Sequence, residues 1–484
     1  MLRGHPAQDE DSEATDRMRI RVVALLIVAG FLVVMVGVWK DSTAAPVVGS
    51  VVPGEYIVVF HNSVTDARSE ARTLGVRYSA SVKHVYERAV KGFAGTVPSA
   101  QLARLRQDAR VKFVTENRVV GIAGVPVAQV PTRTKVPGTP GPTPTGRKGT
   151  PTPTPAPTPP PTGQVLPTGI NRIEGDLSST KSGDGAGSVS MGVAIIDTGI
   201  DLDHPDLNVA GGVNCSDGKS FDDLNGHGTH VAGTVAAKDD GIGVSGGAPG
   251  AVLWAVRVLN AQGFGTTASV VCGIDWIAAN AASLGIKVAN MSLGGSGSDD
   301  GNCGNTNLDV EHMAICNTVN NAGVTFVVAA GNSASNYQNS IPAAYNEVIT
   351  VAAVADFNGL LGGGAAQTCG SFDVDDTAAD FSNFTTIGSA DVSHTIAAPG
   401  KCIFSTWMGG GYNTISGTSM ASPHVAGAAA LCISTGACTG TPGQIMAKIL
   451  ADAAAQPASY GFTNDPNSPN GTRYYGYLIY VGGY

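Results

Sequence analysis

The sequence predicts an α/β fold with a central, mostly parallel sheet covered by helices, preceded by a smaller α+β domain. Residues 164–484 alternate short apolar runs with helix-like stretches, for example at 267–284 and 308–322. Continuous apolar strands that alternate with helices are typical of parallel sheets buried on both faces. The apolar runs of strand length are residues 191–197, 252–258, 288–291, 324–329 and 348–353.

Length and composition indicate a folded protein of several domains. The 484 residues leave room for two to four domains. Only 14% of the residues are charged, 43% are hydrophobic and 64 are glycine, which excludes a mostly disordered chain. The net charge of -9 has the wrong sign for binding a phosphate backbone, so we expect no nucleic-acid partner.

Residues 1–45 are predicted to be a cytoplasmic head followed by a signal or anchor segment. Residues 22–39 form an uncharged apolar run of 18 residues, which fits both a cleaved signal and a retained membrane anchor. Four Lys or Arg residues precede the run and favour a cytoplasmic amino terminus. We therefore expect the remaining chain to be extracellular, either secreted or anchored at the outer face of the membrane.

Residues 46–120 are predicted to form a βαβ-type domain. The expected order is a strand at 55–61, a helix at 66–74, a strand region at 89–98, a helix at 99–108 capped by Ser99, and a strand at 111–120. Residues 121–163 are predicted to be a Pro/Thr-rich linker. Fourteen of the 27 prolines lie within residues 121–168, and such a tract adopts extended polyproline geometry.

The eight cysteines indicate disulfides and an oxidising compartment. Their number is even, all follow residue 214, and none forms a C-x-x-C pair. Four bridges can be arranged in 105 ways, so the sequence leaves the connectivity open. Our tentative pairs are sequential: Cys215–Cys272, Cys303–Cys316, Cys369–Cys402 and Cys432–Cys438.

Three polar residues are candidates for acyl-transfer chemistry. Asp197 ends an apolar strand, His227 lies in a glycine-rich segment, and Ser419 precedes a helix-like stretch. A serine hydroxyl needs a neighbouring base to become a nucleophile, and a histidine base needs a carboxylate to orient it. Taken singly, each residue is better explained by an ordinary role: Asp197 by a turn, His227 by a structural role and Ser419 by a helix cap.

Together the three segments resemble the subtilisin-like serine proteases, or subtilases. The matching blocks are D-T-G-I-D-L-D-H-P-D-L at 197–207, H-G-T-H-V-A-G-T at 227–234 and G-T-S-M-A-S-P-H at 417–424. The resemblance implies the subtilisin-like three-layer fold over residues 164–484, with Ser419 as nucleophile, His227 as base and Asp197 orienting it. Asn332 and Ser419 would form the oxyanion hole. The cysteines and residues 290–295 place the chain nearer the proteinase K-like branch.

The resemblance also implies how substrate binds. Ser292, Leu293 and Gly294 match one strand that pairs with an extended substrate, and Gly263 and Gly265 lie on the strand opposite. For residues 259–266 a plain glycine-rich turn is a serious alternative.

The small domain resembles an inhibitor-type propeptide through residues 53–60 and 91–95. The resemblance implies that the chain's own propeptide occupies the cleft until self-cleavage, near Ala123 or near Gly163.

The resemblance implies no cofactor for catalysis and allows structural calcium, whose ligands the sequence does not assign. Thr395 stands where the family commonly has a calcium-binding aspartate. Two acid-rich segments could bind a hard cation, but we interpret them as solvated loops. They contain Asp299 and Asp300, and Asp373, Asp375 and Asp376.

The sequence therefore predicts a monomeric serine endopeptidase, made as a self-processing precursor, that hydrolyses proteins or peptides. Two alternatives remain open. One is a catalytically silent scaffold with a subtilase fold, and the other is a site-specific processing protease tethered by residues 22–39.

Overall fold

The computed structural model describes residues 46–122, 158, 161–218, 220–370 and 372–484. The predicted membrane-entering run at 22–39 and most of the predicted linker lie outside these residues, so both stay predictions. We call residues 46–122 the small domain and residues 161–484 the large domain.

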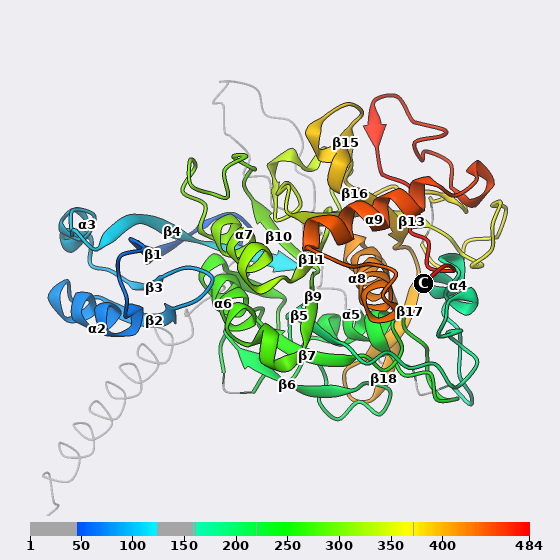
Figure 1. Cartoon of the computed structure of the whole chain (residues 1–484), viewed down its shortest axis with the longest axis horizontal. Coiled ribbons are helices and arrows are strands. Elements are labelled where there is room, and N and C mark those ends of the chain that lie inside the picture. The colour runs from blue at the N-terminus through cyan, green and yellow to red at the C-terminus, as the bar shows by residue number, and fades with distance from the viewer. Residues whose placement is uncertain (1–45, 123–157, 159–160, 219, 371) are drawn as a thin grey trace, which may run out of the picture. The chain divides into compact units, whose positions relative to one another are not determined.

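The small domain is an antiparallel sheet with two helices on one face (Figure 1). Its elements run β-α-β-β-α-β with strand order β4-β1-β3-β2, so the predicted small α+β domain is confirmed, although the expected order lacks one strand. The element missed was β2, whose polar residues alternate with half-buried ones. Ser99 begins its helix as the first helical residue, after Pro98, and does not cap it. The elements are β1 (Val51–Phe60), α2 (Ala67–Arg77), β2 (Ser81–Tyr86), β3 (Gly92–Thr96), α3 (Ser99–Leu105) and β4 (Val111–Ile122).

The large domain is built on an eight-stranded sheet in which all the neighbouring strands but one run parallel. Each of the five predicted apolar runs forms one of its strands, because continuous Val, Ile and Ala residues suit a strand buried on both faces. In order across the sheet, the strands are β6 (Val209–Asn214), β7 (Val252–Arg257), β5 (Gly192–Asp197), β9 (Ile286–Met291), β11 (Thr325–Ala329) and β13 (Val348–Ala355). Beside β13 lie β14 (Thr377–Ala378), the antiparallel strand, and β16 (Thr395–Pro399).

Helices cover both faces of this sheet. Helices α5 (His227–Ala236) and α8 (Thr418–Thr435) pack on one face, and α6 (Thr267–Leu284) and α7 (Val310–Ala322) on the other (Figure 1). Successive side chains of β5 alternate between the two layers, with Ile195 in the α5/α8 core and Ile196 in the α6/α7 core. The predicted three-layer fold is therefore confirmed.

The remaining elements flank the sheet. They are α4 (Thr168–Arg172), β8 (Phe264–Thr266), β10 (Leu293–Ser296), β12 (Ser340–Ile341), β15 (Thr385–Thr386), β17 (Ile403–Trp407), β18 (Gly411–Ile415), α9 (Pro442–Ala454) and β19 (Arg473–Tyr474).

The two faces of the small-domain sheet bury different partners. Val58 and Phe60 of β1 pack with the domain's own helices, whereas Ile57 and Val59 join the core that contains α6 and α7 of the large domain. A sheet of this size gains stability from the second layer, since a domain of about 70 residues is near the lower limit for independent folding.

Four disulfides join the cysteines of the described residues in sequential pairs: Cys215–Cys272, Cys303–Cys316, Cys369–Cys402 and Cys432–Cys438. These are the pairs named from the sequence. All lie in the large domain.

The acid-rich segment with Asp373, Asp375 and Asp376 is not a solvated loop, so that interpretation is wrong. All three carboxylates are buried. Lys401 pairs with Asp373, backbone N–H groups of Phe357 and Ala365 donate to Asp375, and Arg172 pairs with Asp376. Buried charges need such partners, which the sequence does not reveal because the partners are distant along the chain.

Within the described residues, α6 is long and apolar enough to cross a membrane, and 56% of it is buried inside the protein.

Asp206 makes the stability of the fold depend on pH. Its side chain is fully buried and accepts hydrogen bonds from the N–H of Val244 and the hydroxyl of Tyr412. Burial raises the pKa of Asp206 to about 7. Between about pH 4 and pH 7 the folded chain therefore keeps a proton that the unfolded chain has lost, and the free energy of unfolding falls as pH rises.

We predict that Asp206→Asn removes this part of the pH dependence, because the amide keeps the acceptor and cannot ionise. One pKa unit corresponds to about 1.4 kcal/mol, so the effect should be measurable. The check is thermal unfolding at pH 4, 5.5 and 7.5, in the Ser419→Ala background to prevent autolysis. Asp184→Asn, at an exposed site, serves as control. An unchanged pH slope in Asp206→Asn would contradict the prediction.

Candidate active site

The three candidate residues lie where elements of the large domain end or begin. Asp197 is the last residue of β5, His227 the first of α5, and Ser419 the second of α8 (Figure 1). The carboxyl ends of parallel strands meet at one edge of a sheet, where sites form in this type of fold.

Gly226 sets the start of α5. It has φ of 105°, a conformation that favours glycine, and a Cβ there would overlap the indole ring of Trp407. The tight turn therefore brings His227 directly onto the first helical position.

Asp197 and His227 form a buried pair. Nδ1 of His227 lies 2.8 Å from Oδ1 of Asp197, and the N–H of Thr198 donates to the same oxygen at 2.7 Å. Asp197 is fully buried and His227 is 6% exposed. Nε2 of His227 is buried and has no hydrogen-bond partner among the described residues. The carboxylate thus orients the ring with Nδ1 toward Asp197 and leaves Nε2 as the nitrogen that can exchange a proton.

Ser419 is held against β9 and the residue that follows it. The Ser419 hydroxyl donates to the carbonyl of Ser292 at 3.3 Å, and the Ser292 hydroxyl donates to the carbonyl of Ser419 at 2.8 Å. Asn290 donates to the Ser292 hydroxyl in turn and accepts from Ser422 of α8. The structure therefore places Ser292 against the candidate nucleophile. Asn290 was missed because a buried asparagine inside an apolar strand gives no motif.

Asn332 lies beside the start of α8 with its carboxamide fixed. Both the N–H and the hydroxyl of Thr418 donate to Oδ1 of Asn332 at 2.8 Å. The Thr418 hydroxyl also accepts from the N–H of Gly331. With Oδ1 engaged in this way, the Nδ2 donor faces away from Thr418, toward the region beside Gly417. Thr418 is a second residue that the sequence analysis missed.

The last strand of the small domain lies between two strands of the large domain. Gly121 and Ile122 of β4 pair antiparallel with Gly294 and Leu293 of β10. On its other side β4 pairs antiparallel with β8, where Val120 lies opposite Gly265.

The N–H of Ile122 also donates to the carbonyl of Gly263 at 3.1 Å. Within residues 259–266, the strand β8 begins at Phe264, and residues 260–263 form a turn before it, so each interpretation holds for part of the segment. Ile122, Leu293 and Asn332 together line a cavity of about 110 Å³.

Two other histidines near the site are held neutral. Burial lowers the pKa of His230 to about 3 and that of His424 to about 4. Their rings contact backbone carbonyls of Ile403 and Met420.

Asp275 of α6 anchors the small domain. Its carboxylate accepts the backbone N–H groups of Glu87, Arg88 and Ala89 at 2.7 to 2.9 Å. Burial raises the pKa of Asp275. The hydroxyl of Tyr86 donates to the carbonyl of Ala268 at 3.0 Å, also on α6.

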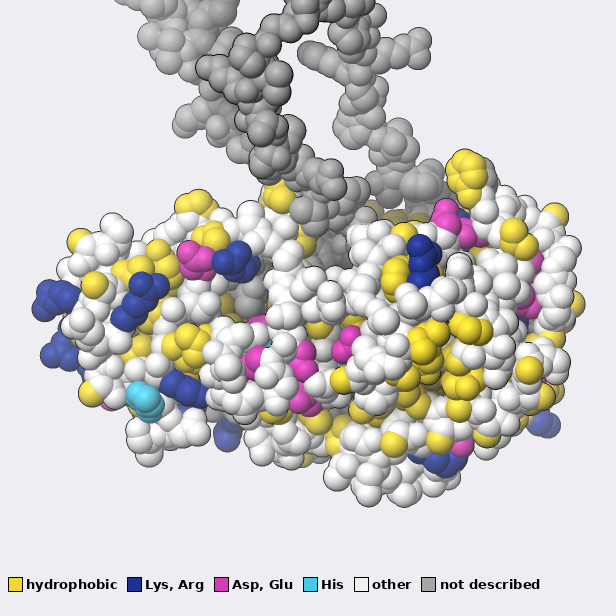
Figure 2. Space-filling view, turned by 90° about the horizontal axis from the view of Figure 1, so that it is seen from above, with side chains coloured by type: hydrophobic (Ala, Val, Ile, Leu, Met, Phe, Trp, Pro, Cys, Tyr) yellow, Lys and Arg dark blue, Asp and Glu magenta, His cyan; other side chains and the backbone are white. Residues whose placement is uncertain are grey.

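Charge also favours this docking. Residues 46–122 contain eleven Lys and Arg against six Asp and Glu, whereas residues 164–484 contain nine against 26. In Figure 2, Lys and Arg side chains gather at the left end of the face shown, where the small domain lies in Figure 1. Opposite net charges attract the two domains and speed their encounter.

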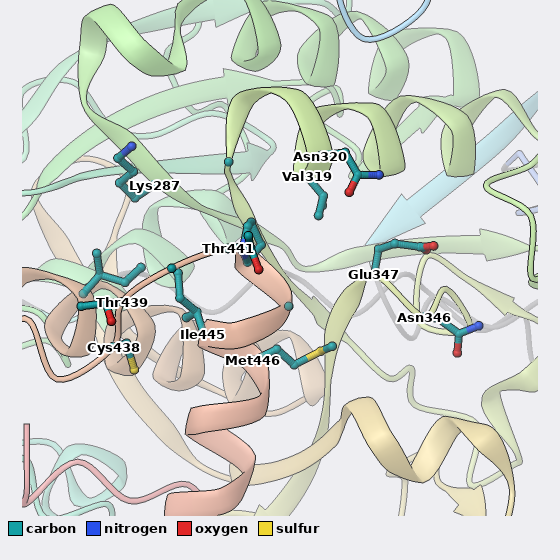
Figure 3. Close-up of a pocket in the computed structure, with 15 residues that line it drawn as sticks. Lys287, Val319, Asn320, Asn346, Glu347, Cys438, Thr439, Thr441, Ile445 and Met446 are labelled. Atoms are coloured by element: carbon teal, nitrogen blue, oxygen red, sulfur yellow. The ribbon is translucent and has the colours of Figure 1, made fainter.

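A cavity of about 580 Å³ lies apart from these residues (Figure 3). It is lined by residues of α7, α9 and neighbouring loops, among them Asn346, Glu347 and Met446. None of Asp197, His227, Ser419 and Asn332 lines it.

A buried Asp–His pair, a serine at a helix start and a parallel sheet covered by helices define a serine hydrolase of the α/β class. Residues 190–477 match the subtilase family, and residues 55–123 match the family described as peptidase inhibitor I9. The chain belongs to the subtilase family and is a serine endopeptidase with an inhibitor-type propeptide.

The chain is similar to several known proteases. It is 41% identical over 279 residues to subtilisin DY from Bacillus licheniformis, covering 56% of this chain and 85% of that protein. It is 34% identical over 389 residues to a thermostable alkaline protease from Halalkalibacterium halodurans, covering 80% of this chain and 83% of the relative. Subtilisin NAT from Bacillus subtilis subsp. natto is 37% identical over 276 residues, covering 56% and 62%. Placement nearer the proteinase K-like branch stays a prediction.

We predict that Asn332→Ala lowers kcat by about 10²–10³ with little change in KM, a magnitude taken from the loss of an oxyanion-hole donor in subtilisin. The reason is that the Asn332 carboxamide stabilises negative charge that develops on the substrate oxygen only in the transition state. Steady-state kinetics on a peptide amide would test this, with Asn470→Ala at an exposed site as control. A change confined to KM would argue for a role in ground-state binding instead.

Proposed function

We propose that Ser419, His227, Asp197 and Asn332 carry out peptide-bond hydrolysis. Ser419 Oγ attacks the substrate carbonyl while its proton passes to Nε2 of His227, whose Nδ1–H stays bonded to Asp197. The tetrahedral oxyanion accepts hydrogen bonds from the Asn332 carboxamide and the Ser419 N–H. The protonated His227 then gives its proton to the leaving amine. Water attacks the remaining ester by the same steps and frees Ser419.

The start of α8 supports this oxyanion hole. Ser419 is the second residue of the helix and so lies in its first turn, where backbone N–H groups point out of the helix end. The positive end of the helix dipole also favours negative charge at this point.

The pairing of β4 with β8 and β10 is the observation that carries the proposed mode of substrate binding. A substrate in extended form would take the place of β4, with Leu293 and Gly294 on one side and Gly263 and Gly265 on the other. Backbone hydrogen bonds would then supply affinity irrespective of sequence, and the pockets between strands would supply selectivity.

The same pairing favours self-cleavage near Ala123 over cleavage near Gly163. Strand β4 carries Ile122 to the cavity that Asn332 lines, so the next peptide bonds are the first to reach the nucleophile. Mass spectrometry of the amino terminus of the mature protein would distinguish the two positions. It would also show whether residues 1–45 are retained.

We further propose that the enzyme works as a monomer outside the cell, either released or tethered through residues 22–39. The disulfides and the basic head of the apolar run support export. Structural calcium remains a proposal without assigned ligands. Thr395 is buried and its hydroxyl contacts Tyr337 and the carbonyl of Asp391, so it contributes packing at the position where the family commonly has a carboxylate.

We predict that Ser419→Ala abolishes self-processing and casein digestion, because no acyl-enzyme can form. The precursor should run at full length on a gel, and a serine-directed fluorophosphonate probe should not label it. Ser434→Ala, on the last turns of the same helix, should mature and be labelled normally. Processing or digestion by the purified Ser419→Ala chain would refute the proposed nucleophile, and an unlabelled parent chain would favour the scaffold alternative.

We predict that Asp275→Ala shortens the lag between self-cleavage and full activity, because three backbone N–H groups of the propeptide lose their acceptor. Ala89 is buried, and a buried N–H left without a partner costs about 1–3 kcal/mol, so release should accelerate about tenfold. Activity would be followed in time after maturation starts, alongside gel filtration of the cleaved propeptide. Asp240→Ala is the control, since its carboxylate accepts only from its own loop in the described residues. An unchanged lag would show that Asp275 does not anchor the propeptide.

A further inference from the structure

A cluster of carboxylates around His312 lies apart from the candidate active site. His312 is in the first turn of α7 and is fully buried, with its ring stacked on Tyr345 at 4.1 Å between centroids. Asp299 and Asp300 come from the loop that follows β10. The three residues offer ligand atoms that all lie within 4.8 Å of one another.

Nδ1 of His312 is buried and has no hydrogen-bond partner in the described residues. Its nearest acidic neighbours are Oδ1 of Asp299 and Oδ1 of Asp300, both at 3.5 Å. A charged N–H donor would close to about 2.7–2.9 Å on one carboxylate. Equal distances of 3.5 Å instead fit three ligands around one cation, since tetrahedral bonds of about 2.0–2.2 Å put ligand atoms about 3.3–3.6 Å apart.

The groups around the cluster hold these ligands in place. Nε2 of His312 lies 2.8 Å from the carboxylate of Glu347 and donates to it, so in the neutral form of the ring Nδ1 carries no proton. A histidine that binds a metal typically donates its other ring nitrogen to such a carboxylate. Asn346 donates to Asp299, and four backbone N–H groups donate to Asp300. Figure 3 shows Asn346 and Glu347 side by side at one edge of the 580 Å³ cavity.

We propose that Asp299, Asp300 and Nδ1 of His312 bind a divalent transition-metal ion of the zinc type. A nitrogen ligand and short spacing favour zinc over calcium, which takes six to eight oxygen ligands at longer distances. The side chain of Asp299 is 17% exposed, so solvent reaches the cluster and can supply a fourth ligand. The interpretation of Asp299 and Asp300 as a solvated loop is thereby replaced, because Asp300 is only 5% exposed.

The ion would fasten the loop after β10 to α7 and the segment at Glu347. The disulfide Cys303–Cys316 already closes the same region, and β10 is the strand that pairs with β4. Binding of the ion would therefore stabilise the folded chain by mass action. The stabilised loop follows β10, which borders the proposed substrate groove.

The test uses the full chain with Ser419→Ala, stripped with EDTA and dialysed against micromolar Zn²⁺ or, separately, Ca²⁺. We expect about one zinc per chain by mass spectrometry of the metal, a rise in unfolding temperature with Zn²⁺, and no equivalent retention of Ca²⁺ by this cluster. Asp299→Asn should bind zinc at least tenfold more weakly. The control Asp184→Asn should bind zinc as tightly as the parent chain. Asp184 accepts a hydrogen bond from the N–H of the residue two positions later, as Asp299 does, but it lies at an exposed site.

Zinc X-ray absorption of the parent chain provides a second measurement that does not depend on a folded variant. One imidazole nitrogen and carboxylate oxygens in the coordination shell would support the site. The proposal is overturned if the parent retains no zinc, if Asp299→Asn binds as tightly as the parent, or if the spectrum shows no imidazole ligand. Retention of Ca²⁺ in place of Zn²⁺, lost in Asp299→Asn, would overturn the choice of metal class.

Discussion

The hydrogen bond between Asp197 and His227 joins the sheet to the helix layer at the point where chemistry is proposed to occur. It depends on a strand that ends inside the protein, because only burial on both faces of β5 brings a carboxylate to a dry position. A buried carboxylate without partners would be unstable, and the N–H of Thr198 and the ring of His227 supply those partners. The glycine turn before α5 and the placement of α8 across the same sheet face follow from this arrangement.

The main features of the large domain could be predicted because they depend on local patterns. Buried parallel strands have unbroken apolar sequences. Ser419, His227 and Asp197 lie within sequence motifs that resemble those of a known family. The small-domain topology could not be predicted in this way. Strand β2 carries Lys83 and His84, which give no apolar signal, so its hairpin with β3 was missed.

Residues that position the candidate site residues through hydrogen bonds were the hardest to predict from the sequence. Asn290 and Thr418 carry no chemistry of their own, yet they fix the positions of Ser292 and Asn332. Their role arises from hydrogen bonds between distant segments: Thr418 and Asn332 are 86 residues apart in sequence, and Asn290 and Ser422 are 132 apart. The buried aspartates at 373–376 were misjudged for the same reason, because Arg172 and Lys401 are remote in the chain.

The position of β4 has a kinetic meaning. Because the propeptide and the enzyme are one polypeptide until the connecting segment is cut, the inhibitor is present at a local concentration that dilution cannot lower. Each molecule is therefore silenced from the moment it folds, at any expression level and before it meets another protein. Cutting the tether converts a first-order association into a bimolecular one, so the volume into which the protein is released decides how long the inhibition lasts.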